Sequence, residues 1–429
     1  MPLTRRSFLR RTAGAASLAA GAAGAAWTAA STGCAPADTR RAGAHSAPAL
    51  PTDVRIVRIE AAVLRGDRGR VVGRNARKGV HGQYATDPVV RLTTDTGQTG
   101  WGWSRARRKD AAVQALLGTR LADAFDPAAG TREALLALDF PLWDLAGRVL
   151  GRPVYALLGA AGPHPVPVYD GSIYFDDLDP ETGKDRGLGP VLDAVAKGLA
   201  RGHTAFKVKV GRGNKWMEKE AGFARDVAVL EAVRRRIGPD GVLLMDANDG
   251  YTPEGARALA HRVRGLNVGW FEEPFPETVA DCAAFRAWLR DGGFGTLLAD
   301  GEGVGPAREP AFTEIVRAGG VDVVQFDLRG WTLTRWRAYV PVLAETKTRS
   351  APHNWGSHLS GFYIAQFARG CGHFARGEVD PMVMPAVVSE GYRVADGHMR
   401  VPDTPGFGLD LDADRFAAAV RGGGWVMEG

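Results

Sequence analysis

The first third of the chain largely alternates apolar and polar residues, a pattern that predicts strands followed by helices. VRIVRIEAAVL, residues 54–64, has the alternation of a strand, and PVVRLTTDTGQTGWGW, residues 88–103, is typical of two strands around a turn. Helical periodicity follows near residues 111–117 and again in EALLALDFPLWDLAGRVLG, residues 133–151. We therefore expect an α+β domain over residues 52–160.

From about residue 163 onward the pattern changes to short apolar runs separated by helical stretches. The runs are VPVYDGS, AFKVKV, VLLMDAN, GWFEEPF, TLLAD, VDVVQFD, SAPHN and HFARGEV. Repeated strand–helix units indicate a parallel sheet, and about eight of them in roughly 225 residues favour a closed (β/α) barrel. An open doubly wound sheet is the alternative, but it usually has a glycine-rich turn after its first strand, and this chain shows none there. The sequence predicts an α/β protein with a (β/α) barrel of the TIM type over residues 161–385, followed by a C-terminal segment, residues 386–429.

Ionisable residues stand at or near the ends of the predicted barrel strands. They are Lys209, Asp246, Glu272, Glu302, Asp327, His353 and Glu378, with spacings of 37, 26, 30, 25, 26 and 25 residues. These spacings correspond to about one strand–helix unit each. Because the carboxyl ends of barrel strands meet at one mouth, we expect these groups to share a single cavity.

The types of these residues indicate a specific chemistry. Three carboxylates, from Asp246, Glu272 and Glu302, need a cation if they are to lie together, and oxygen ligands without cysteine favour Mg²⁺. Lys207 and Lys209 lie on one face of a strand, so their mutual repulsion and partial burial are expected to lower the pKa of one ammonium group until it acts as a base. The arrangement suits removal of a proton next to a carboxylate, with the metal stabilising the enediolate.

A carboxylate–histidine dyad is expected on the far side of the mouth, with Asp327 orienting an imidazole. Two histidines compete for this place. His353 lies 26 residues after Asp327 and keeps the unit spacing, whereas His358 lies 31 residues after it, in SHL. Glu273, next to Glu272, is expected to form a structural salt bridge, since adjacent strand residues point to opposite faces.

In order along the chain, KVK, MDAN, FEEP, GE and VVQFD resemble the mandelate racemase/muconate lactonizing enzyme branch of the enolase superfamily. ALDFPLWDLAGRVLGRPVYALLGA, residues 137–160, is similar to the segment that joins the capping domain of that family to its barrel. The resemblance implies a barrel with an α+β capping domain built from the N-terminal region and the C-terminal tail. It also implies Mg²⁺ as cofactor and a small-molecule carboxylate as substrate.

The resemblance implies a role for each site residue. It implies that Asp246, Glu272 and Glu302 bind the metal. It implies catalytic roles for Lys209, Asp327 and His353 or His358, and for Lys207, which holds the substrate carboxylate. Asn248 and Glu378 are implied to contact the metal ligands or the substrate. Substrate selection is expected from the capping domain, near residues 77–84. The expected reaction is dehydration of a hydroxy acid or acid sugar. Racemisation or epimerisation of a 2-hydroxy acid, and a non-catalytic lipoprotein that binds sugar acids, are the alternatives.

The N-terminus has the pattern of an export signal. TRRSFLR, within residues 1–34, resembles a twin-arginine motif and precedes an Ala/Gly-rich apolar run, and STGC makes a lipid anchor at Cys34 an alternative to simple cleavage. Residues 35–51 are expected to be a linker. Four of the six net positive charges lie in residues 1–34, and the remaining +2 gives no reason to expect a nucleic-acid partner.

Two further properties bear on location and assembly. No later window is long and apolar enough for a membrane span. The twin-arginine-type signal leads us to expect an extracellular, periplasmic or surface-attached protein. Cys282 and Cys371 either form a disulfide or remain buried thiols. A homo-oligomer is compatible with the sequence.

Overall fold

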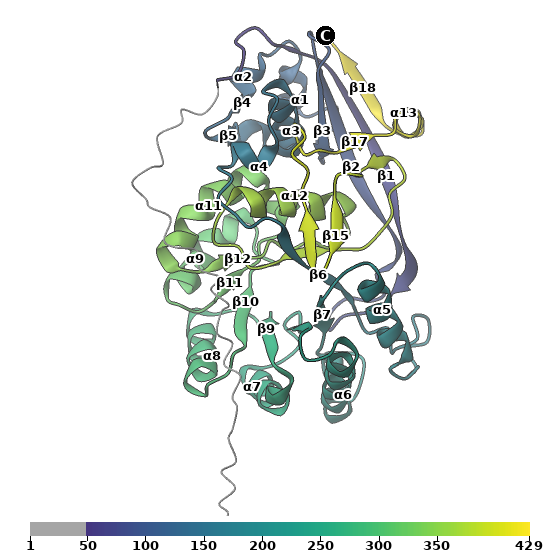
Figure 1. Cartoon of the computed structure of the whole chain (residues 1–429), viewed down its shortest axis with the longest axis vertical. Coiled ribbons are helices and arrows are strands. Elements are labelled where there is room, and N and C mark those ends of the chain that lie inside the picture. Colours follow the sequence, from purple (N-terminus) through teal and green to yellow (C-terminus); the bar gives the residue numbers. More distant parts are fainter. Residues whose placement is uncertain (1–48) are drawn as a thin grey trace, which may run out of the picture. The chain divides into compact units, whose positions relative to one another are not determined.

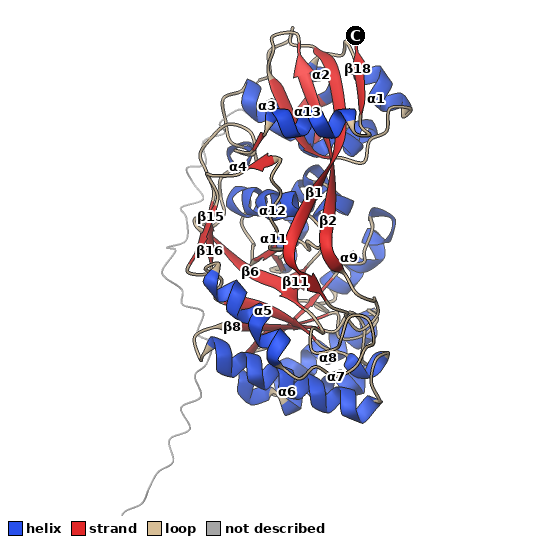
Figure 2. Ribbon diagram, turned by 90° about the vertical axis from the view of Figure 1, so that its right-hand side faces the viewer, coloured by secondary structure: helices blue, strands red, loops and turns tan. Residues whose placement is uncertain are grey.

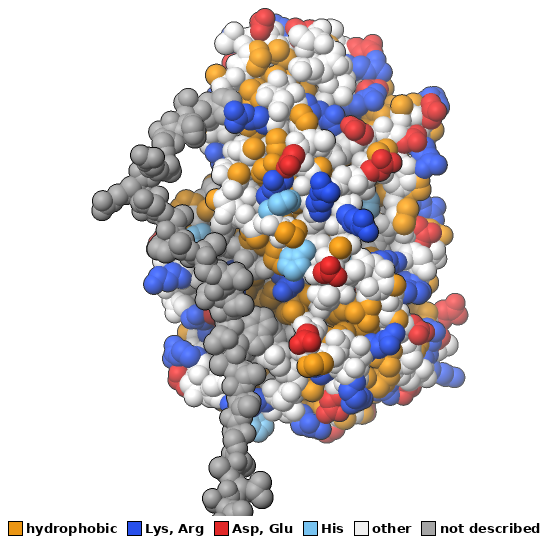
Figure 3. Space-filling view, in the orientation of Figure 1, with side chains coloured by type: hydrophobic (Ala, Val, Ile, Leu, Met, Phe, Trp, Pro, Cys, Tyr) orange, Lys and Arg blue, Asp and Glu red, His pale blue; other side chains and the backbone are white. Residues whose placement is uncertain are grey.

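The structure, a computed structural model, describes residues 49–429 (Figures 1 and 2). The predicted export signal, Cys34 and most of the predicted linker lie outside these residues. Within the described part, no helix is both long and apolar enough to span a membrane. On the face shown in Figure 3, basic and acidic side chains are interspersed over the described surface.

The capping domain is built on a four-stranded antiparallel sheet with the order β18-β1-β2-β3. Its strands are β1 (Ile56–Val72), β2 (Gly82–Thr94), β3 (Thr99–Trp103) and β18 (Trp425–Glu428). Ala61 of β1 is paired with Val90 of β2 on one side and with Trp425 of β18 on the other. The end of the chain therefore completes the sheet that the first described strand begins, as Figure 2 shows.

Short helices accompany this sheet. They are α1 (Ala111–Leu116), α2 (Leu121–Ala124), α3 (Asp139–Val149), α4 (Val154–Leu157) and α13 (Ala413–Arg421), with a small hairpin of β4 (Phe125–Asp126) and β5 (Gly130–Thr131). The helix expected over residues 133–151 is divided into a 3₁₀ turn at Glu133–Leu138 and α3. Pro141 explains the division, because it lacks an N–H and is best accommodated in the first turn of a new helix.

The barrel domain contains the predicted parallel strands, so the α/β prediction is confirmed. The strands are β6 (Val166–Ile173), β7 (Ala205–Lys209), β8 (Val242–Asp246), β9 (Val268–Glu272), β10 (Leu297–Asp300), β11 (Val323–Val324), β12 (Arg349–Ser350) and β13 (Gly377–Val379). Strands β6 to β12 pair with their neighbours in chain order, and β13 pairs with β6. An isolated parallel bridge between Ser350 and Phe374 links β12 to the segment that enters β13.

Helices cover the outside of these strands (Figure 1). They are α5 (Gly189–Ala200), α6 (Lys219–Ile237), α7 (Pro253–Arg262), α8 (Val279–Asp291), α9 (Glu309–Arg317), α10 (Leu328–Trp331), α11 (Leu333–Thr346) and α12 (His358–Gly370). Two small antiparallel pairs complete the fold: β14 (Val387–Val388) with β17 (Asp410–Leu411), and β15 (Arg393–Ala395) with β16 (His398–Arg400). Cys282 and Cys371 are buried free thiols, so the disulfide alternative is wrong.

A layer of buried side chains fills the interior of the barrel below the mouth. Its members come from strands β6 to β11 and from the position that directly follows β12: Tyr169, Ala205, Leu244, Trp270, Ala299, Val323 and Ala351. Because every second residue of a strand points to the same side, the residues two positions later form the next layer toward the mouth. That second layer contains Lys207, Asp246, Glu272, Gln325 and His353, so the alternation of the strands positions the polar site directly above an apolar plug.

Candidate active site

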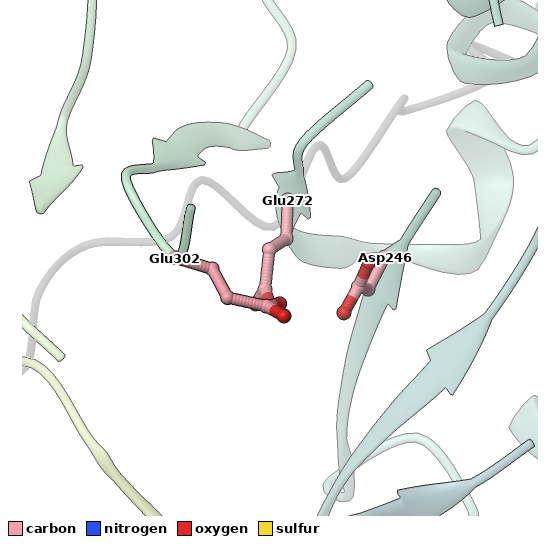
Figure 4. Close-up of side chains that lie close together, drawn as sticks. All are labelled: Asp246, Glu272 and Glu302. Atoms are coloured by element: carbon pink, nitrogen blue, oxygen red, sulfur yellow. The ribbon is translucent and has the colours of Figure 1, made fainter. Parts of the chain in front are cut away.

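Three carboxylates from consecutive strands meet at the mouth of the barrel. Asp246 ends β8, Glu272 ends β9, and Glu302 follows β10. One oxygen of each lies within 4.8 Å of the others, and Figure 4 shows the three side chains converging. Asp246 and Glu272 are fully buried. The structure therefore brings together all three residues that the sequence analysis assigned to metal binding.

The donor set fits Mg²⁺. All three donors are hard carboxylate oxygens, the ligands that this ion prefers. Burial and the nearby charge of Asp246 raise the pKa of Glu272 to about 8, which shows how unfavourable a second buried negative charge is at this position. A divalent cation would relieve that repulsion, so Asp246, Glu272 and Glu302 would hold it.

Both lysines of β7 point into the same cluster. Lys207 Nζ is paired with Glu272 and lies 2.9 Å from Glu378 Oε1 and 3.3 Å from Asp246 Oδ2, while Lys209 Nζ is paired with Asp246. The two ammonium groups can be buried because each one faces at least one carboxylate.

The electrostatics of the lysines differ from the sequence-based expectation. Burial lowers the pKa of Lys209, but Asp246 and the more distant Glu302 and Glu272 outweigh it, and the net pKa is raised. Burial also lowers the pKa of Lys207, but Glu272 and Glu378 outweigh it, and the pKa is raised well above its ordinary value. The expectation of a lowered lysine pKa gave too much weight to the repulsion between the two lysines and too little to the attraction of the carboxylates. A cation bound to the same oxygens would compete with the lysines for them.

His353, and not His358, forms the dyad with Asp327. His353 Nδ1 lies 3.0 Å from Asp327 Oδ2, and its Nε2 lies 3.4 Å from Glu302 Oε2. Burial lowers the pKa of His353, but Glu302 and the hydrogen bond to Asp327 raise it to about 9. The same hydrogen bond helps hold the pKa of Asp327 below its usual range despite burial.

His358 has a different place in the fold. It is the first residue of α12, its backbone N–H donates to Asp87 Oδ2 at 2.9 Å, and its ring lies edge-on to Phe362. The alternative assignment of His358 to the dyad is therefore wrong, because a turn and the helix start separate it from Asp327.

Glu378 and Asn248 lie beside the cluster, as the resemblance implied. Glu378 Oε2 accepts a hydrogen bond from the backbone N–H of Asn354 at 2.9 Å, which leaves Oε1 facing Lys207. The Asn248 amide lies 3.2 Å from Glu273 Oε2 and 3.5 Å from Glu302 Oε2. Glu273 forms no ion pair within residues 49–429, so the expected salt bridge is wrong, and Asn248 is its partner instead.

Two groups that the sequence analysis missed contact the site. Gln325 donates to Glu272 Oε2 at 2.7 Å, and Trp270 Nε1 lies 3.2 Å from the same oxygen. Both sit at inward positions of their strands, two residues from another barrel-facing residue. The alternation was therefore the signal that could have identified them, since it places a polar Gln325 inside the barrel.

The capping domain contributes a loop between β1 and β2, residues 73–81, that overlaps the segment expected to select the substrate. His81 of this loop packs on Tyr174 and Trp355, with ring centroids 4.6 and 5.4 Å apart. Tyr174 in turn places its ring 5.2 Å from Lys209 Nζ. The loop therefore adds His81 to an aromatic wall that Tyr174 forms beside the lysine.

Comparisons with known proteins agree with this architecture. The chain matches the family described as "Enolase C-terminal domain-like" over residues 191–415. It is 29% identical to the D-galactarolactone cycloisomerase of Agrobacterium fabrum over 361 residues, which is 76% of this chain and 89% of that protein.

Two solved structures from Geobacillus sp. are also similar. One is galacturonate dehydratase complexed with D-galacturonate and 5-keto-4-deoxy-D-galacturonate, at a TM-score of 0.81 and 33% identity, covering 89% of this chain and 100% of that chain. The other is a mandelate racemase/muconate lactonizing protein of strain Y412MC10 complexed with magnesium and tartrate, at a TM-score of 0.82 and 32% identity, covering 89% and 98%.

Proposed function

The chain belongs to the enolase superfamily, in its mandelate racemase/muconate lactonizing enzyme branch, and we propose that it is a Mg²⁺-dependent dehydratase of an acid sugar. The observation that supports this proposal most strongly is the position of two proton-handling groups at the carboxylate triad. Lys209 contacts Asp246 at one end of the triad, and His353 contacts Glu302 at the other. A substrate whose carboxylate is held between them would present its α-carbon to one group and its β-hydroxyl to the other.

Lys209 is the proposed base. When bound, Mg²⁺ would supply positive charge to the substrate carboxylate and so make the neighbouring C–H bond more acidic. Lys209 must lose its own proton before it can accept another, and Asp246 stabilises the charged form. Engagement of Asp246 with the cation would weaken that ion pair, while Lys207 holds the substrate carboxylate.

His353 is the proposed acid. In the metal-free protein, Glu302 and Asp327 raise the pKa of His353 and keep the imidazole protonated at neutral pH. Asp327 also fixes the orientation of the ring through Nδ1. Abstraction of the α-proton by Lys209 leaves an enediolate, which expels the β-hydroxyl as water when His353 Nε2 donates a proton to it. The resulting enol rearranges to a 2-keto-3-deoxy acid.

A panel of hexonates, hexuronates and aldarates, tested with Mg²⁺ and followed by mass spectrometry, tests the proposal. A product lighter than its substrate by one water supports dehydration. Deuterium uptake from D₂O into an unchanged carbon skeleton supports the racemase or epimerase alternative, and binding without turnover across the panel supports the non-catalytic alternative. Deuterium uptake into unchanged substrate, or binding without turnover, would overturn the proposal that the protein is a dehydratase.

The named cycloisomerase relative favours a second candidate reaction. The same abstraction of an α-proton, followed by departure of a lactone oxygen instead of a hydroxyl, would isomerise a sugar lactone. When aldarolactones are added to the panel, a product of unchanged mass whose lactone ring has opened would identify this reaction.

We also propose that the protein is exported through its twin-arginine-like N-terminus, with Cys34 as a candidate lipid anchor. The basic start followed by an apolar run supports this proposal. Cell fractionation after changing Arg5 and Arg6 to lysine tests it, with retention inside the cell as the expected result and unchanged export as the contradicting one.

A further inference from the structure

His81 belongs to a loop of the capping domain that is attached firmly to the barrel. The backbone carbonyl of Asn75 accepts a hydrogen bond from Trp216 Nε1 at 2.6 Å, and that of Ala76 accepts one from Asn214 Nδ2 at 3.0 Å. Arg77 forms an ion pair with Asp249 at 3.0 Å. The barrel thus holds the loop in place, and His81 follows within it.

The hydrogen bonds of His81 determine which ring nitrogen carries the proton. Nδ1 lies 3.1 Å from the carbonyl oxygen of Gly73 and 3.0 Å from that of Gly79. A backbone carbonyl can only accept, so Nδ1 must be the donor. Burial and the charge of Lys209 lower the pKa of His81 to about 4, so the ring is neutral at pH 7. Nε2 therefore carries a lone pair and can only accept a hydrogen bond.

This acceptor has no hydrogen-bond partner among residues 49–429. The His81 ring packs on Tyr174, and Tyr174 places its ring 5.2 Å from Lys209 Nζ. Trp355 completes the wall, with its ring 4.5 Å from that of Tyr174. An oriented, neutral acceptor thus stands one aromatic ring away from the proposed base.

We propose that Nε2 of His81 accepts a hydrogen bond from a hydroxyl group of the substrate. His81 would thus select acid sugars that carry a hydroxyl within reach of this nitrogen. This inference rests on the proposed function, because it requires a polyhydroxy carboxylate at the triad. His81 is a substrate-binding residue in this account. It does not exchange protons with the substrate, since Nδ1 keeps its proton on the two carbonyls throughout.

Two substitutions distinguish the roles of the two ring nitrogens of His81. In His81→Asn, the side-chain amide stands where Nδ1 was and preserves the anchor to Gly73 and Gly79, but nothing replaces Nε2. In His81→Gln, the amide reaches the position of Nε2 but abandons the anchor. Val80→Ala is the matched control, because Val80 is exposed on the same loop.

The experiment measures binding of D-galacturonate and its 3-deoxy and 4-deoxy analogues to each Mg²⁺-loaded protein by calorimetry. We expect His81→Asn to weaken binding of D-galacturonate about tenfold, the effect of losing one hydrogen bond at a desolvated site. It should leave unchanged the binding of the analogue that lacks the selected hydroxyl. His81→Gln should recover part of the loss, and Val80→Ala should match the wild type.

The outcomes distinguish this inference from the proposed function. An equal loss for all three sugars overturns the inference, because a role confined to anchoring the loop would affect every ligand alike. If His81→Asn loses the hydroxyl selectivity and the wild type binds these sugars without turnover, the role of His81 is supported and the dehydratase is contradicted. Failure of the wild type to bind any of the three sugars would overturn the inference.

Discussion

Replacing Asp380 with asparagine is expected to destabilise the protein, because it leaves Arg68 as a buried charge without a counterion. Arg68 lies on β1 of the capping domain, and Asp380 follows β13 of the barrel. The pair is bidentate, with Nε–Oδ1 at 2.9 Å and Nη2–Oδ2 at 2.7 Å, and the side chains are 3% and 0% exposed. Asp380 Oδ2 also accepts from the backbone N–H of Gly356 at 2.9 Å.

The expected magnitude follows from burial. Breaking one side of a buried ion pair costs about 3–5 kcal/mol. Unfolding of about 380 residues has an entropy of roughly 0.8 kcal/mol per kelvin, so the melting temperature should fall by roughly 4–6 °C. The amide of Asp380→Asn also presents N–H groups to the N–H groups of Arg68 and Gly356, and no rotation of the amide satisfies all three donors.

Differential scanning calorimetry of the wild type, Asp380→Asn and the double variant Arg68→Met/Asp380→Met measures this effect. The double variant removes both charges and should recover most of the lost stability, because an apolar pair needs no counterion. A single variant that melts within about 1 °C of the wild type would refute the reasoning, and so would a double variant as unstable as the single one.

Three other predictions concern the mouth of the barrel. Saturating Mg²⁺, at about 100 times its Kd, should raise the melting temperature of the wild type by roughly 3 °C; Glu272→Gln should abolish this shift, and a shift of wild-type size in the variant would contradict the assigned ligand. In protein treated with a chelator, the pKa of His353 is raised to about 9, so its stabilising contribution is complete below pH 6.5 and lost as the pH rises toward 9. The difference in melting temperature between the wild type and His353→Asn should shrink over that range, whereas a constant difference would argue against the raised pKa. Finally, a Cβ added at Gly171 would lie 2.2 Å from Glu378 Oε1, so Gly171→Ala should displace Glu378 from Lys207 and lower kcat/KM roughly a hundredfold; wild-type kinetics would show that Glu378 is dispensable there.

The sequence was informative where a side chain is positioned by its own strand. Asp246 and Glu272 follow from the alternation within β8 and β9, and from a spacing of one strand–helix unit. The same regularity distinguishes the two histidines, since Asp327 and His353 form a parallel bridge that continues the pairing of β11 and β12. His358 breaks the spacing because it begins a helix.

Properties that depend on several distant segments could not be derived in this way. The pKa of Lys209 is set by carboxylates from three other parts of the barrel, whereas the sequence pattern shows only its neighbour Lys207. Glu273 adopts a positive φ of 39°, so the alternation rule that predicted a salt bridge on the opposite face does not apply to it. The contact of His81 with Tyr174 joins residues of different domains and leaves no local signal.

The proposed dehydration depends most directly on Lys209, the base that removes the α-proton. Loss of the α-proton signal in D₂O, followed by proton NMR with Mg²⁺ and an acid sugar that the enzyme converts, measures that step. Lys209→Met should slow the loss by a factor of about 10²–10⁴ while binding of the sugar persists. A variant that loses the α-proton signal at the wild-type rate would contradict the role of Lys209 as the base.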